Sequence, residues 1–218
     1  MNKSSGHHLL AVKTKKVFFI TLAFICLGGC AGSGKPPYSI DTYFLDYPAP
    51  VARLAETIPA TLKFSRFSVA AAYNSTHMIF RKDAYRFDFF NYSRWAVNPG
   101  DMVADRLLRD IRESGLFQAV FSRQEMEDGR FVISGSVEDF FLRVDNDRGT
   151  AVIALNVSLK DSAAKEAGKK IIFQKQYRSE EPLTEASPYG YSQAASQAMQ
   201  KISEQVIGDL RTAVKNNL

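Results

Sequence analysis

From residue 38 onward, the pattern of hydrophobic and polar positions predicts two groups of β-strands, each followed by a helix. Alternation of apolar and polar residues indicates a strand, and it is clearest at 60–69, through Leu62, Phe64 and Phe67. The first group comprises strands at 39–47, 60–69, 76–82 and 84–92, with Asp83 near the turn of a hairpin formed by the last two. The second comprises strands at 116–121, 130–144, 150–159 and 170–178.

The two helices have clear boundary signals. The first begins after Asn98, a good N-cap residue, has Pro99 at its first position, and ends at Gly115. The second covers 191–214, where apolar residues recur at every fourth position. The water-facing side of the first helix is expected to carry two i,i+4 ion pairs, Asp105–Arg109 and Arg106–Asp110.

This order of elements predicts one α/β domain. Its sheet is mixed and mainly antiparallel, because the last three strands follow one another through short turns as a meander. Two principal helices pack on the sheet, and the second is long and C-terminal. Two helices cannot cover both faces of a broad sheet, so part of an aromatic-rich surface could be left for a partner or for lipid.

The first 29 residues have the pattern of a signal peptide. Four lysines precede the apolar run 17–27, which has 11 residues, whereas a helix needs about 20 to span a bilayer. Leu27-Gly28-Gly29-Cys30 follows, which resembles a bacterial lipobox. The resemblance implies cleavage before Cys30, which would carry a diacylglycerol and an N-acyl chain. We therefore expect a signal peptide at 1–29, a lipidated flexible tether at 30–37 and one domain at 38–218.

The charge of the chain changes meaning once this leader is recognised. The whole sequence has 28 basic and 23 acidic residues, a formal net charge of +5, which alone would invite a nucleic-acid partner or an anionic membrane. Four of the basic residues and none of the acidic ones precede Cys30, so residues 30–218 carry 24 basic and 23 acidic residues. The excess belongs to the leader, and a nucleic-acid partner is not expected.

The sequence offers little to an enzyme. His77 is the single histidine after the leader, and neither a Gly-x-Ser-x-Gly nor a His-Glu-x-x-His motif accompanies it. We expect His77 to be a surface or strand-end residue. The acidic residues at 145–149 lack the later ligands of a calcium loop and are better explained as a turn. No catalytic residue, no metal ligand and no cofactor beyond the acyl chains on Cys30 are predicted.

Aromatic and arginine residues alternate between Phe80 and Trp95. The simplest interpretation is that the aromatic side chains build the core and the arginines face water. Interleaved arginines and aromatics could also stack nucleic-acid bases, although an exported, membrane-anchored protein rarely meets them. The third interpretation is a protein-facing or lipid-facing surface. The residues chosen as partner contacts are Tyr92, Arg94 and Trp95.

Together, these motifs resemble the ABC-type transport auxiliary lipoprotein family. The resemblance extends from about Ser39 to the C-terminal helix. It is carried by the lipobox and by Tyr43-Phe44-Leu45, Ile79-Phe80-Arg81, Tyr85-Arg86, Tyr92, Trp95-Ala96, the proline-started helix and Ser114-Gly115-Leu116-Phe117. These are an aromatic pattern and not a catalytic signature.

The resemblance implies a non-enzymatic lipoprotein at the periplasmic face of the outer membrane, which docks a periplasm-spanning MCE-domain protein there. An ABC transporter ATPase and permease would be indirect partners, and a ring of like subunits is a further expectation. Ala31 follows Cys30 where an aspartate would signal inner-membrane retention. The alternative is an envelope-assembly or scaffold lipoprotein that binds a β-barrel, lipopolysaccharide or peptidoglycan. A periplasmic hydrolase is a third hypothesis.

Overall fold

A computed structural model describes residues 38–50, 53–146, 148–166 and 170–217. The chain divides into two units, residues 1–39 and 40–218, and every element below belongs to the second. The predicted signal peptide, the tether at 30–37 and Cys30 lie outside the described residues. The elements are β1 (Asp41–Tyr43), β2 (Ile58–Val69), η2 (Ala71–Tyr73), β3 (His77–Arg81), β4 (Phe87–Trp95), α2 (Pro99–Ser114), β5 (Phe117–Phe121), β6 (Phe131–Asp145), β7 (Arg148–Asp161), β8 (Ile171–Pro182) and α4 (Pro188–Lys215).

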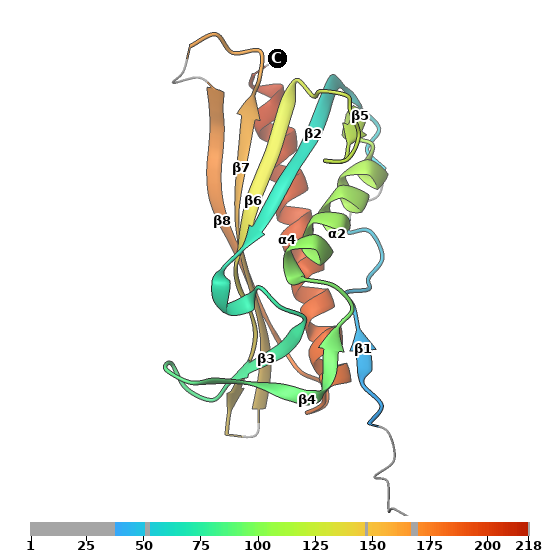
Figure 1. The fold of residues 1–218 in the computed structure, drawn as a ribbon. Coiled ribbons are helices and arrows are strands. Elements are labelled where there is room, and N and C mark those ends of the chain that lie inside the picture. Colours follow the sequence, from blue (N-terminus) through green and yellow to red (C-terminus); the bar gives the residue numbers. More distant parts are fainter. Residues whose placement is uncertain (1–37, 51–52, 147, 167–169, 218) are drawn as a thin grey trace, which may run out of the picture. The chain divides into compact units, whose positions relative to one another are not determined.

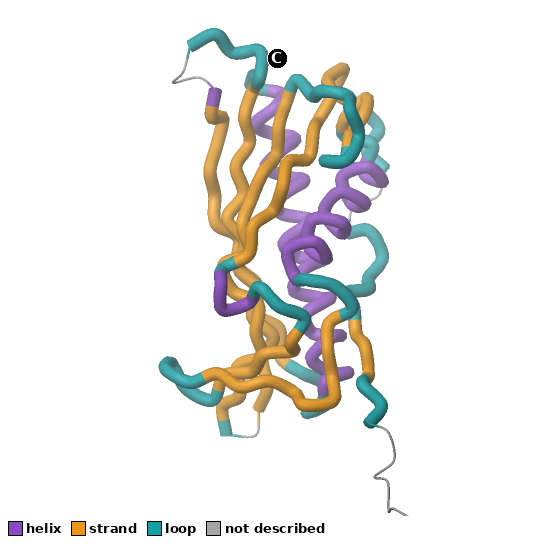
Figure 2. The backbone as a smooth tube through the Cα atoms, in the orientation of Figure 1, coloured by secondary structure: helices purple, strands orange, loops and turns teal. Residues whose placement is uncertain are grey.

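The predicted α/β class is confirmed: eight described strands form one mixed sheet, and two principal helices accompany it. The long strand β6 organises the sheet. It pairs antiparallel with β7 along its whole length, and β7 pairs antiparallel with β8, which gives the expected meander. On its other side β6 pairs in parallel first with β2 and then with β3. The turn η2 separates β2 from β3 (Figure 2).

Both helices pack on one face of the sheet (Figure 1). Helix α4 covers β7 and β8, while α2 covers β2 and β5 and also contacts α4. The core lies between the two helices and this face of the sheet, and it includes Phe131, Ile133 and Leu155, all fully buried. On the opposite face, charged side chains pair with one another: Arg143 with Glu180 at 2.8 Å and Arg178 with Asp139 at 2.6 Å.

The helix boundaries follow the predicted signals. The side-chain oxygen of Asn98 accepts a hydrogen bond from the backbone N–H of Gly100 at 2.9 Å, and Gly115 ends α2 at a φ of 65°. A positive φ is favourable for glycine and strained for other residues, which explains the residue at this position. Helix α4 begins at Pro188, earlier than the predicted residue 191, because Ser187 accepts from the N–H of Gly190.

The strand predicted at 39–47 is much shorter in the structure, and this prediction was wrong beyond Tyr43. Only β1 joins the sheet there, in parallel with β4. The next backbone amides bond to helix side chains: the N–H of Leu45 points to Met102 Sδ at 3.4 Å, and that of Asp46 to Ser196 Oγ at 3.0 Å. Segment 44–47 is therefore held by the helices, and alternation alone could not reveal it.

We predict that Gly135→Ala lowers the free energy of unfolding by about 1–3 kcal/mol, because overpacking displaces a tight contact. A Cβ at Gly135 would lie 2.6 Å from the carbonyl oxygen of Asn156 and 2.6 Å from the ring of Phe67. Gly208→Ala is the control: nothing lies within 4 Å of its Cβ, and alanine should stabilise helix α4 by about 0.5–1 kcal/mol. Urea unfolding of both variants checks the opposite signs, and equal effects would contradict the close packing at Gly135.

Candidate functional site

The β3–β4 hairpin is the candidate site, and its turn is built by Asp83. One carboxylate oxygen accepts hydrogen bonds from the backbone N–H groups of Tyr85 and Arg86, both at 2.9 Å. The other accepts from the guanidinium of Arg86 at 2.7 Å. The hydrogen bond from Tyr85 is the largest of the interactions that lower the pKa of the Asp83 carboxyl. The predicted hairpin, with Phe80 opposite Asp88, is confirmed.

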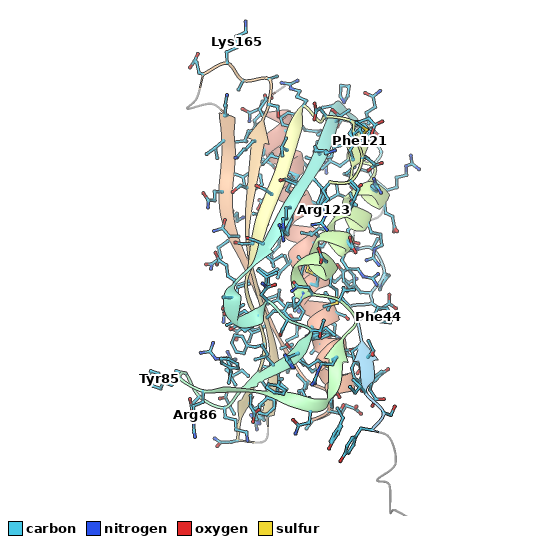
Figure 3. The ribbon with its side chains drawn as sticks, viewed as in Figure 1. Phe44, Tyr85, Arg86, Phe121, Arg123 and Lys165 are labelled. Carbon is cyan, nitrogen blue, oxygen red and sulfur yellow. The ribbon has the colours of Figure 1, made fainter. Side chains whose placement is uncertain are left out.

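The aromatic side chains of this hairpin are largely exposed, so the interpretation that they build the core is wrong for most of them. Tyr85 is 96% exposed, Phe87 59% and Tyr92 53%. Figure 3 shows Tyr85 and Arg86 at the tip, directed away from the sheet. The physical reason is that β3 pairs with β6 only at Phe80 and Arg81, so the tip after Arg81 lies beyond the strand pairing.

Three aromatic residues of the hairpin do face inward: Trp95, which is buried, and Phe80 and Phe90, which are partly buried. The rings of Phe80 and Phe90 pack against each other with centroids 5.2 Å apart. Beside them lies a cavity of about 260 Å³, which also reaches Leu183 and is bordered by two cationic residues, Lys82 and Arg148. The hairpin thus has an apolar inner hollow with cationic residues at its edge, together with an exposed aromatic tip.

The three predicted partner contacts lie in different environments. Trp95 is 1% exposed, and its ring packs edge-on against Phe140 and Tyr191, each at 5.2 Å. Its assignment as a surface contact is therefore wrong, because the indole offers no accessible face. The guanidinium of Arg94 donates to the carbonyl oxygens of Phe90 and Ser93. Of the three side chains, that of Tyr92 is the most accessible.

His77 lies at the start of β3, as expected of a strand-end residue. Its ring is 4.3 Å from the ring of Phe89, and Nδ1 is 3.2 Å from Ser75 Oγ. Among the described residues, no group of three or more histidine, cysteine, aspartate or glutamate side chains could hold a metal ion.

A buried polar cluster surrounds Asp110, which the sequence pattern had placed on the water-facing side of its helix. The Asp110 carboxylate is 1% exposed and accepts hydrogen bonds from the hydroxyls of Tyr47 at 2.9 Å and Ser203 at 2.6 Å. Arg109 donates two more, at 2.9 and 2.6 Å. The cluster joins α2 to α4 and to segment 44–47. Asp110 is seven residues, about two turns, after the buried Val103, and this spacing was the available signal.

The predicted i,i+4 pairs on α2 are therefore wrong. Arg109 pairs with its neighbour Asp110 at 2.6 Å, and Arg106 pairs with Asp46 at 3.6 Å. The physical reason is that Asp110 lies on the buried side of the helix, where the hydroxyls compensate for its lost hydration.

Tyr47→Phe should flatten the loss of stability at alkaline pH. Burial, and then the Asp110 carboxylate, raise the pKa of Tyr47 above its ordinary value of 10.0. The unfolded chain then loses this proton first, so the stability present below pH 10 falls as the pH rises, by about 1.4 kcal/mol per unit for one tyrosine. Tyr177, whose pKa is also raised by burial, keeps part of the slope in the variant.

The measurement is urea unfolding of the wild type and variant between pH 8 and about 11. Tyr85→Phe serves as the control, because its hydroxyl lies in solvent and the alkaline slope should stay that of the wild type. An unchanged slope in Tyr47→Phe would show that the Tyr47 hydroxyl is not held as described.

The comparison with protein families is decisive for the identity of the chain. A family model described as "ABC-type transport auxiliary lipoprotein component" matches residues 43–207, which is nearly all of the compact unit. The chain belongs to this family. The resemblance found in the motifs is thus confirmed, and the hairpin is a feature of an auxiliary lipoprotein domain.

Solved structures show the same fold as this auxiliary lipoprotein. A crystal structure of a Xanthomonas campestris protein has a TM-score of 0.71 at 17% identity and covers 81% of this chain and 97% of that one. A hypothetical protein from Chlamydia trachomatis has a TM-score of 0.51 at 10% identity and covers 72% of this chain and 98% of that one. The comparison with curated proteins gives no match. In the described part of the chain, no helix has the length and apolar character needed to span a membrane.

Proposed function

We propose that this auxiliary lipoprotein is a non-enzymatic component of an MCE/ABC-type lipid transport system, which docks the periplasm-spanning MCE assembly at the outer membrane. The observation that carries the proposal is the family match over residues 43–207, because it links the folded unit to ABC-type transport. The ATPase and permease are indirect partners in this scheme, and several copies of the chain form a ring around the docked assembly.

The membrane attachment belongs to the same proposal. Cys30 carries the diacylglycerol and the N-acyl chain, and Ala31 after it favours transfer to the outer membrane. Three chains bind far more firmly than the single chain that gives only marginal attachment. Labelled palmitate should enter the wild type and not Cys30→Ser, and the wild type should sediment with outer-membrane vesicles. Label in both the wild type and Cys30→Ser, or in neither protein, would contradict attachment at Cys30.

The partner surface is proposed at the hairpin side of β4. Tyr92 is half-exposed there, and Arg94 is held beside it by carbonyl oxygens. Trp95 is excluded from this surface by its burial. The polar face of β6–β8 is less suited to docking, because its charges already pair with each other, as Arg178 does with Asp139.

Native pull-down tests the proposal. The acylated chain, extracted in mild detergent, should retain an MCE-domain protein and, in lower amount, the ABC subunits. Tyr92→Ala should reduce the recovered MCE protein, whereas the matched change Met126→Ala, at an exposed residue outside the hairpin, should not. An extract without any MCE or ABC subunit would contradict the proposal. Recovery of a β-barrel, lipopolysaccharide or peptidoglycan instead would favour the scaffold alternative.

A further inference from the structure

We propose that the tip of the β3–β4 hairpin, residues 82–88, inserts into the headgroup region of the phospholipid leaflet that holds the protein's own anchor. The inference rests on the acyl anchor of the proposed function, and it needs no transport partner. It assigns a lipid-binding role to a surface whose aromatic side chains do not take part in the core. The supporting observations are side-chain chemistry, charge, chain length and the cavity beside the tip.

The side chains of the tip match the interfacial layer of a bilayer. Tyr85 is 96% exposed and Phe87 59%, and Arg86 lies between them with its side chain 83% exposed. Aromatic rings settle at the headgroup level, where the ring is shielded from water and a polar end stays hydrated. Exposed apolar side chains that lie close together, as Tyr85 and Phe87 do, mark a contact with a protein or a membrane.

The charge of the whole hairpin favours an anionic lipid surface. Residues 81–94 contain four basic residues and two acidic ones, whereas residues 30–218 as a whole are nearly balanced. The hairpin as a whole therefore has a formal charge of +2, whereas its tip, residues 82–88, contains two basic and two acidic residues and is formally neutral. Anionic phospholipids attract basic residues near the surface by about 1 kcal/mol each. Arg86 and Asp83 compensate each other at the tip, so Lys82, which lies over the ring of Phe80, supplies this attraction.

The chain between the anchor and the sheet limits how far the hairpin can lie from the membrane. Eleven residue steps separate Cys30 from Asp41, which at full extension span about 40 Å at most. Asp41 begins β1, and β1 pairs with the hairpin strand β4, with Asp41 opposite Ser93. The anchor's tether therefore leads into β1, which pairs with the C-terminal part of the hairpin strand β4, and β1, β3 and β4 lie at the same end of the domain (Figure 1).

The hollow beside the tip has the composition that a phospholipid requires. Phe80, Phe90 and Leu183 supply apolar walls to a volume of about 260 Å³, while Lys82 and Arg148 supply cations at its border. An acyl segment fits the apolar wall, and a phosphate fits the cations. One phospholipid supplies both the acyl segment and the phosphate, so we assign the hollow to a lipid of the same leaflet.

Quenching of an introduced tryptophan by brominated lipid tests the proposal. The acylated full chain is reconstituted into vesicles of phosphatidylethanolamine and phosphatidylglycerol, with acylation checked by mass spectrometry and no other protein present. Tyr85→Trp places the probe at the tip. Met126→Trp is the matched control, because Met126 is also 96% exposed but lies in the loop before β6. The hairpin joins β6 at Leu142, eleven residues after the start of β6 at Phe131, which corresponds to about 35 Å along the strand. The native Trp95 is buried and gives a constant background.

The expected result is that brominated acyl chains reduce the emission of the Tyr85→Trp probe about twofold, with a shift to shorter wavelength, and leave Met126→Trp unchanged. Equal quenching of both probes would overturn the proposal, because the tether alone would then bring the whole domain to the lipid. No quenching of either would overturn it as well. In a separate sample, an MCE protein is added to the vesicles. If Tyr85→Trp is not quenched by the lipid and its emission shifts to shorter wavelength only after this addition, the tip is a protein contact instead. Because no transporter is present, failure of the lipid experiment leaves the pull-down result unaffected.

Discussion

Trp95→Ala is expected to lower the free energy of unfolding by about 3–5 kcal/mol, more than any other single substitution proposed for this chain. The indole is 1% exposed and lies edge-on between Phe140 of β6 and Tyr191 of α4. Its removal leaves a cavity between the sheet and the long helix, and two aromatic rings lose their partner. Urea unfolding of the purified protein measures the change.

The neighbouring Tyr92→Ala is the matched control for Trp95. Its side chain is half-exposed and outside the core, so the expected loss is below about 1 kcal/mol. If Trp95→Ala instead weakened partner recovery while leaving stability intact, the indole would be a contact residue and its placement in the core would be wrong.

Asp110→Ala should destabilise the protein by about 3 kcal/mol, because one buried carboxylate satisfies three side chains at once. The hydroxyls of Tyr47 and Ser203 lose their acceptor, and the guanidinium of Arg109 loses its charged partner. Arg109 is partly exposed, so its guanidinium can be hydrated after Asp110 is removed. The expected loss of stability is therefore at the lower end of the range for breaking a buried ion pair. Thermal or urea unfolding checks the value.

Asp105→Ala on the same helix separates the cluster from a general effect of removing charge. Asp105 is exposed, and partial desolvation followed by repulsion from Asp101 raise its pKa. Its removal should change stability by no more than about 0.5 kcal/mol. Similar losses in Asp105→Ala and Asp110→Ala would contradict the account of Asp110 as the acceptor that joins the two helices.

Much of the fold could be predicted from local signals, because such signals depend only on residues that are close together in the sequence. Asn98 and Gly115 mark the ends of α2 through a side-chain acceptor and a left-handed φ, and both roles depend on residue type alone. The meander of β6, β7 and β8 likewise follows from short turns, which leave antiparallel pairing as the simplest arrangement.

Non-local pairing explains what the sequence could not reveal. Both β2 and β3 use the same edge of β6, one after the other, so the tip of the hairpin reaches past this edge. The alternation of residues in the hairpin shows that its strands have two faces, but it does not show which element packs against each face. For this reason Phe80 is partly buried and Tyr85 exposed, although both belong to one aromatic pattern. The burial of Asp110 depended similarly on a tyrosine and a serine distant in sequence.

Crosslinking in living cells tests the central claim, that this chain docks an MCE assembly, most directly. A photoreactive residue in place of Tyr92 is compared with one in place of Gln176, which lies exposed on the polar sheet face and is bonded to Glu138. Adducts are identified by mass spectrometry after irradiation. The predicted result is an adduct between the Tyr92 position and an MCE-domain protein, with little from the Gln176 position. Adducts from the Tyr92 position that contain only a β-barrel or peptidoglycan, and never an MCE-domain protein, would contradict it.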